Sequence, residues 1–101
     1  MLAEESTATD EAALAYYRRA VEAGEQGLGA QFFENNVGHF WGLIESRPYM
    51  RAKVCLAQSL WDLGLEDEAI THYQDCLRLN PNDNQGIRDR LAAYLLLKND
   101  L

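Results

Sequence analysis

The stretch MRAKVCLAQSLWDLGLEDEAITHYQDCLRLNPND, residues 50–83, decides the fold of this chain. Its apolar and small residues recur three and four positions apart, the spacing that places side chains on one face of a helix. Gly64 interrupts the pattern in the middle and Pro81 ends it, so the stretch predicts two helices joined by a short turn. Ala57 and Ala69 are small, as expected where two antiparallel helices cross with their backbones close together.

The same 34 residues resemble the tetratricopeptide repeat, a helix–turn–helix unit with the pattern W-x2-L-G-x2-Y…A-x3-F…P. The residues that carry the resemblance are Lys53-x-x-Leu56-Ala57-x-x-Leu60, Gly64, Ala69-x-x-x-Tyr73 and Pro81. The resemblance implies an all-α fold of antiparallel helix–turn–helix repeats, a fragment of a right-handed solenoid. One such unit cannot bury its apolar face alone, so it also implies neighbouring helices.

A partial repeat precedes this unit. Ala13 and Tyr17 copy the spacing of Ala69 and Tyr73, so residues 10–24 read like the second helix of another repeat. We expect Thr9 or Asp10 to cap this helix and Gly24 to end it.

A second partial repeat follows. After the stop at Pro81, Asn82 or Asp83 can cap a further helix running from Asn84 to about Leu97. Residues 84–101 therefore read like the first helix of a following repeat, and residues 1–101 as one domain.

Residues 25–49 form an insertion. Ala13 and Ala69 lie 56 residues apart, whereas contiguous repeats of 34 would leave about 22 fewer. We expect one or two short helices, about 29–35 and 37–44, and then a serine cap at Ser46 with Pro48 in the first turn of the next helix. The insertion and its border are rich in aromatic residues, which either fill the core or form a partner-binding pocket: Phe32, Phe33, Phe40, Trp41 and Tyr49.

The insertion carries a second resemblance. Gly38-His-Phe-Trp-Gly-Leu43, followed by Arg47-Pro-Tyr-Met-Arg-Ala52, is similar to an element in uncharacterised bacterial tetratricopeptide proteins. That similarity implies no particular activity.

The composition excludes several classes of function. A formal charge of −7, from 16 acidic and 9 basic residues, argues against nucleic-acid and anionic-membrane partners, which require a basic face. Cys55 and Cys76 are too few for a disulfide framework, and Cys76 is expected to be a buried thiol. The chain shows no secretory signal, and its longest apolar run, residues 91–97, is far shorter than a membrane span. We therefore expect a cytoplasmic location.

No catalytic, metal or cofactor motif is apparent, so we expect no enzymatic activity, no metal and no cofactor. His72 is expected to be a solvated or half-buried surface residue on the outer side of the repeat's second helix. His39, between Glu34 and Glu45, is either hydrogen-bonded within the aromatic cluster or a ligand-binding or catalytic residue.

The tetratricopeptide resemblance implies non-enzymatic binding of a peptide or helix of a protein partner on a concave face. That face draws on Arg51, Gln58, Trp61, Asp62, Gln85, Arg88 and Leu95. In the insertion, His39 and Trp41 are the candidate contacts. Val54 and Gln58 stand where the carboxylate-clamp version of the repeat has lysine and asparagine, which argues against that ligand.

Self-association is the alternative function. The last helix exposes Leu91, Leu95 and Leu96 unless something covers them: a partner, another copy, or the remainder of a longer protein. We favour the longer protein, because the pattern breaks mid-repeat at both ends.

Overall fold

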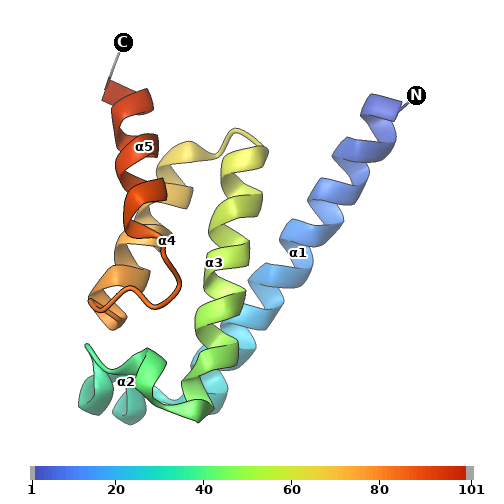
Figure 1. The fold of residues 1–101 in the computed structure, drawn as a ribbon. Helices are drawn as coiled ribbons and strands as arrows, with labels where there is room; N and C mark the ends of the chain where they lie inside the picture. Colours follow the sequence, from blue (N-terminus) through green and yellow to red (C-terminus); the bar gives the residue numbers. More distant parts are fainter. Residues whose placement is uncertain (1, 100–101) are drawn as a thin grey trace.

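The computed structural model describes the backbone of residues 2–99 and, within it, the side chains of residues 9–98. In the described part of the chain the regular structure is entirely helical, which confirms the predicted all-α fold (Figure 1). The elements are α1 (Leu2–Leu28), α2 (Ala30–Asn36), two 3-10 turns η1 (Phe40–Gly42) and η2 (Ile44–Ser46), α3 (Arg47–Asp62), α4 (Glu66–Leu79) and α5 (Arg88–Asn99). None of these helices combines the length and apolar character needed to cross a membrane.

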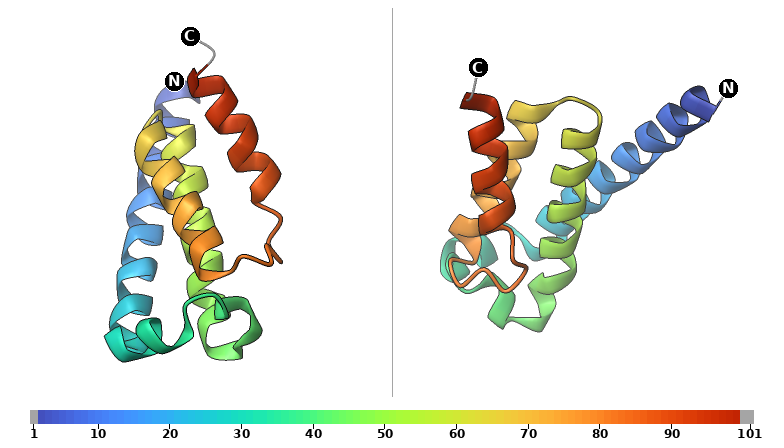
Figure 2. Two further views of the ribbon diagram at one scale, coloured as in Figure 1. Left: turned by 90° about the vertical axis from the view of Figure 1, so that its left-hand side faces the viewer. Right: turned by 45° about the horizontal axis from the view of Figure 1, so that its top comes forward.

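Helix α3 occupies the centre of the molecule. It packs along α4 on one side and against the C-terminal part of α1 on the other, while α5 lies against α4 (Figures 1 and 2). Helices α1 and α5 therefore lie at opposite edges. The N-terminal half of α1 diverges from α3, whereas α2 and the two 3-10 turns gather at the other end of the molecule.

The pair α3–α4 forms the predicted helix–turn–helix. Pro48 lies in the first turn of α3, and Gly64 adopts a φ of 84°, a left-handed conformation that favours glycine. Ser46 does not cap α3 as predicted. Its hydroxyl instead donates to the carbonyl oxygens of Phe40 and Leu43, because the two 3-10 turns bring those carbonyls within reach. The serine thus fastens the insertion to the start of α3.

Helix α1 is longer than predicted at both ends. Thr9 and Asp10 lie within it rather than capping it, and Gly24 lies within it rather than ending it. A Cβ on Gly24 would come within 2.7 Å of the Tyr49 ring, so this glycine permits close approach of α1 and α3. The chain turns instead at Gly29, where φ is 84°.

The insertion is only partly helical. Helix α2 agrees with the predicted helix at about 29–35, whereas the expected helix at 37–44 is replaced by η1 and η2. The turn at Gly38, with a φ of 93°, and the second glycine, Gly42, disfavour a continuous α-helix here.

Helix α5 begins at Arg88, four residues later than predicted. Asp83 therefore does not occupy the N-cap position, but its carboxylate accepts the backbone N–H groups of Ile87 (2.7 Å) and Arg88 (2.9 Å), at the start of α5. Leu91 was expected to lack cover but is buried against the body of the protein, at 6% exposed. Leu95 is half-buried, and Leu96 is exposed as expected, at 71%.

One continuous apolar core connects α1, η1, α3, α4 and α5. Ala57, Ala69 and Tyr73 are fully buried where α3 and α4 meet, and Cys76 is the expected buried thiol. Burial raises the pKa of this thiol to about 12. The other buried apolar residues are Val21, Phe40, Tyr49, Met50, Leu56, Leu60, Ile70, Leu79, Ile87 and Leu91.

Candidate protein-binding surface

A hollow of about 370 Å³ lies between α1 and α3. It forms where the two helices begin to diverge, beyond their close contact at Gly24 and Tyr49. The Tyr49 hydroxyl donates to Glu25 at 3.0 Å and holds this end of α1 in place. The hollow is lined by Tyr16, Tyr17, Ala20 and Gly24 of α1 and by Pro48, Tyr49, Arg51, Ala52 and Cys55 of α3.

Two tyrosines form the α1 wall of the hollow. Tyr16 is 68% exposed and meets the Tyr17 ring edge to face, with the ring centroids 5.4 Å apart. The half-buried Cys55 of α3 lies close to Tyr17, and its proximity raises the pKa of the Tyr17 hydroxyl. The wall is therefore mostly apolar, with hydroxyl and thiol groups that can orient a bound chain.

Arg51 and Trp41, both predicted as binding residues, lie together at the border of the hollow. The Arg51 guanidinium lies 5.5 Å from the centre of the Trp41 ring, and the Arg47 guanidinium lies 5.1 Å from it. Arg47 also donates to the Trp41 carbonyl at 2.8 Å. The exposed Arg51 thus places a positive charge beside an apolar hollow on an otherwise acidic protein.

The other aromatic residues of the insertion fill the core. Phe40 is fully buried, and its ring contacts those of Phe32, Phe33 and Tyr49. The prediction that His39 is hydrogen-bonded within this cluster is wrong. Its side chain is exposed, because the tight turn that directs Phe40 inward leaves the preceding residue facing solvent.

Three of the predicted concave-face residues have partners within the chain. The side-chain oxygen of Gln58 accepts the hydroxyls of Tyr73 (3.1 Å) and Tyr94 (3.2 Å), and its nitrogen donates to Asp62 (2.9 Å). Trp61 stacks on Tyr94, with centroids 3.7 Å apart and planes nearly parallel. These residues hold α5 against α3 and α4.

The remaining predicted residues lie on or before α5, away from the hollow. Gln85 is half-buried in the connection between α4 and α5, and Leu95 is half-buried on α5. Arg88 is exposed and donates to the Pro81 carbonyl at 2.8 Å. Arg51 thus lines the hollow, whereas Arg88 lies at the start of α5.

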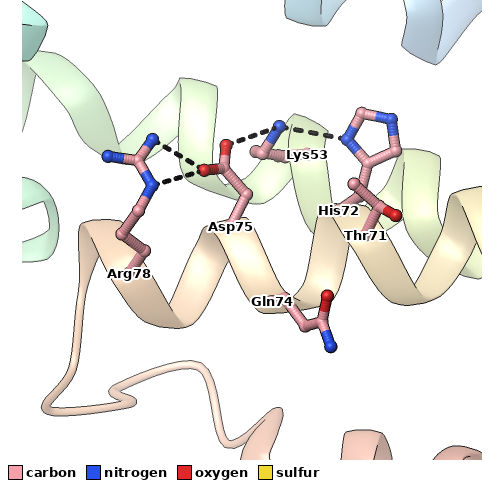
Figure 3. Close-up of a pocket in the computed structure, with 6 residues that line it drawn as sticks. All are labelled: Lys53, Thr71, His72, Gln74, Asp75 and Arg78. Carbon is pink, nitrogen blue, oxygen red and sulfur yellow. Dashed lines mark hydrogen bonds and ion pairs between the residues drawn. The ribbon is translucent and has the colours of Figure 1, made fainter.

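A buried lysine between α3 and α4 was not singled out as a site from the sequence (Figure 3). Lys53 is 3% exposed, and its ammonium lies 3.0 Å from His72 Nδ1 and 3.1 Å from an Asp75 oxygen. One carboxylate oxygen of Asp75 also accepts hydrogen bonds from the Arg78 guanidinium, from Nη2 at 2.6 Å and from Nε at 2.8 Å. The sequence did hold a signal for this cluster, because Lys53 lies on an otherwise apolar helix face. A buried charge requires partners, so charged or polar residues were to be expected next to it.

The electrostatics of this cluster follow from burial and pairing. Burial lowers the pKa of His72, which is half-buried as predicted, and the adjacent Lys53 lowers it further. Burial alone would raise the pKa of Asp75, but Arg78 and Lys53 outweigh it and the pKa falls. The cluster surrounds a hollow of about 310 Å³, but its charged groups are already satisfied by one another. It therefore fits a structural role better than a binding role.

Glu68 connects this cluster to α1. Its carboxylate accepts two hydrogen bonds from Arg18, at 2.6 Å and 3.1 Å, which lower the pKa of Glu68. The same carboxylate lies 3.9 Å from His72. Within the described residues, no group of three or more histidine, cysteine or acidic side chains is arranged to hold a metal ion.

Comparison with known families agrees with this architecture. Residues 51–83 match the tetratricopeptide repeat, with α3 and α4 as its two helices. The match covers about a third of the chain and does not include the aromatic insertion. No curated protein and no solved structure matches the chain. Tetratricopeptide repeats generally mediate protein–protein interaction and are typically non-enzymatic, which is the broad class of function that residues 51–83 indicate.

Proposed function

We propose that this chain is a non-enzymatic interaction module that binds a helical segment of a protein partner in the hollow between α1 and α3. The observation that carries the proposal is a difference between two helices with the same pattern. Ala13, Tyr17 and Ala20 of α1 occupy the same spacing as three residues of α4, yet α1 lacks the cover that α4 has.

Helix α4 supplies the reference state. Ala69 and Tyr73 are 0% exposed and Cys76 is 1% exposed, because α3 packs along them. The corresponding residues of α1 are only half-buried, and two of them, Tyr17 and Ala20, line the hollow. A helix placed against α1 as α3 is placed against α4 would cover them. This supports a helix as the ligand.

The lining favours a particular type of helix. Ala20 and Ala52 are small and leave room for the ligand backbone to approach, as Ala57 and Ala69 do in the α3–α4 pair. The exposed guanidinium of Arg51 suits a carboxylate on the ligand, with which it can form paired hydrogen bonds. We therefore propose a ligand helix with small and apolar side chains on one face and an acidic residue at the Arg51 end.

The two cysteines allow a direct test. Cys55 lines the hollow, whereas Cys76 is buried and its pKa is raised to about 12, so an alkylating reagent in neutral buffer should react at Cys55. Helical peptides selected from a displayed library against the 101-residue chain should slow this labelling at least severalfold. Ala52→Trp should abolish their binding by filling the hollow, while Gln74→Trp, at an exposed site on α4, should leave it unchanged.

Two results would contradict the proposal. One is selected peptides that bind the wild-type chain without altering the labelling of Cys55. The other is equal binding of those peptides to Ala52→Trp, provided that circular dichroism shows the variant to be folded.

A further inference from the structure

Helix α5 presents a second uncovered surface in the same molecule. Its inner side buries Leu91, next to Ile87 just before the helix, but its outer side is apolar and exposed: Leu96 is 71% exposed and Leu97 is 62% exposed. Ala92 and Ala93, one turn earlier, are also exposed and leave this side of the helix nearly smooth. A contiguous apolar helix face of this kind is typical of an interaction surface.

We propose that the hollow between α1 and α3 takes the α5 helix of a second copy of this chain. The inference rests on the proposed function, that the hollow accepts a helix, and it names the partner. The outer side of α5 has the features that the hollow favours, since it is narrow at Ala92 and Ala93, apolar at Leu96 and Leu97, and acidic at Asp89.

Charge complementarity sets the direction of the bound helix. Asp89 is exposed in the first turn of α5, and Arg51 is exposed at the end of the hollow nearest Gly24. Pairing these two residues places the N-terminal end of α5 beside the C-terminal end of α1. The bound α5 then runs antiparallel to α1, as α3 does relative to α4 in the complete repeat.

The spacing of the apolar residues agrees with this direction. Leu96 follows Asp89 by seven residues, about 10 Å along a helix. In the hollow, Tyr16 precedes Gly24 by eight residues, about 12 Å along α1. An ion pair between Arg51 and the partner's Asp89 would therefore bring the two exposed leucines against the exposed ring of Tyr16, and both apolar surfaces would be buried together.

The proposed contact joins two different surfaces, α5 of one copy and the hollow of another, so the same contact can form again at each free end. Helices α1 and α5 lie at opposite edges of the molecule, so each copy offers one α5 and one hollow to different neighbours (Figure 1). Such a head-to-tail contact produces a growing chain of copies rather than a symmetric dimer. A single helix in a hollow buries less surface than a stable dimer interface, so association should be weak and dependent on concentration.

Sedimentation velocity of the 101-residue chain over a wide concentration range tests the inference. The weight-average mass of the wild type should rise beyond that of a dimer. Tyr16→Asp, which damages the hollow, and the double variant Leu96→Asp with Leu97→Asp, which damages α5, should each be monomeric. Because each retains one intact surface, mixing the two should give a one-to-one complex that grows no further. Ile44→Asp is the matched control, because Ile44 is 78% exposed but lies in the insertion.

A charge exchange tests the direction. Arg51→Asp and Asp89→Arg should each weaken association by about fivefold, the size of an exposed ion pair, and the two together should restore it. A wild-type chain that stays monomeric at its highest soluble concentration would overturn the inference, as would an Ile44→Asp variant as defective as the Leu96 and Leu97 variant. If displayed peptides protect Cys55 in such a monomeric chain, the proposed function stands and only the choice of partner fails.

Discussion

Helices α1 and α4 share a pattern but differ in their surroundings. Ala13 and Tyr17 have the same spacing as Ala69 and Tyr73, yet Ala69 and Tyr73 are fully buried while Ala13 and Tyr17 are half-buried. Helix α4 is covered along its length by α3, whereas α1 contacts α3 closely only toward its C-terminal end. The comparison shows that a repeat pattern specifies a surface ready to be covered, and that the neighbours decide whether it is covered.

The largest expected effect comes from truncating the two tyrosines. Tyr73→Ala should lower the free energy of unfolding by about 3–5 kcal/mol, because it leaves a cavity between α3 and α4. Tyr17→Ala should cost about 1 kcal/mol, since solvent already reaches its ring. Urea denaturation of both variants measures the difference. Equal losses would mean that α1 is covered as completely as α4, and the comparison between them would fail.

Enlarging the alanine in each helix, Ala69 in α4 and Ala13 in α1, should have a smaller effect on stability than truncating the tyrosines. Ala69→Leu should destabilise the protein by about 1–3 kcal/mol, because the interface between α3 and α4 has no space for a larger side chain. Ala13→Leu should change stability by less than about 0.5 kcal/mol, because α1 is open there. Thermal unfolding followed by circular dichroism is sufficient to check this. A destabilised Ala13→Leu variant would show that the N-terminal half of α1 packs more tightly than the half-burial of Ala13 indicates.

The polar cluster of Lys53, His72 and Asp75 predicts a pH dependence. The pKa of His72 is lower in the folded than in the unfolded protein, so the unfolded state binds a proton first as the pH falls. The contribution of His72 to stability is therefore complete above its ordinary pKa of 6.5 and decreases as the pH falls through and below that value. His72→Gln should remove this component of the pH profile. An unchanged slope between neutral and mildly acidic pH would show that His72 does not titrate differently on folding.

The smallest effect is expected for the ion pair that joins α1 to α4. Arg18 and Glu68 are each about two-fifths exposed, so solvent screens their attraction. Arg18→Ala should cost less than about 1 kcal/mol, and the loss should diminish further in high salt. A double-mutant cycle with Glu68→Ala isolates the pair. A coupling energy well above this range would indicate that the pair sets the position of α1 on the α3–α4 hairpin.

Features of the fold that depend on neighbouring residues in the sequence could be predicted, whereas features that depend on distant residues could not. Pro48, Gly64 and Pro81 are local signals, and the bounds of α3 and α4 agree with them. Gly24 looked like the end of a helix, but its role depends on Tyr49, which lies 25 residues away and needs the space of the missing Cβ. In the insertion, the predicted helix at 37–44 is instead two 3-10 turns, since Gly38 and Gly42 disfavour a continuous α-helix. Local pattern alone could not show this, because the hydrogen bonds of Ser46 stabilise the turns.

The candidate site shows the same division. Arg51 and Trp41 were predicted, and the structure brings them together at the hollow. Gln58 and Trp61 were predicted for the concave face but contact Tyr94, because α5 packs against them. Tyr16, Tyr17 and Cys55 were not predicted, since the hollow exists only through the divergence of α1 from α3, which no local pattern encodes.

Because α1 and α3 are in close contact at Gly24, a small tilt of α1 at this point displaces its N-terminal part by a larger distance. Thr9 lies 15 residues before Gly24, about 22 Å along the helix, so a tilt of about 5° at the contact moves the far turn by roughly 2 Å. One methyl group at position 24 would meet the Tyr49 ring, so either the ring or α1 would have to move. The width of the hollow between α1 and α3 therefore depends on the contact at Gly24. Exchanging Gly24 for a larger residue would therefore change the width of the hollow, while the other residues that line it stay the same.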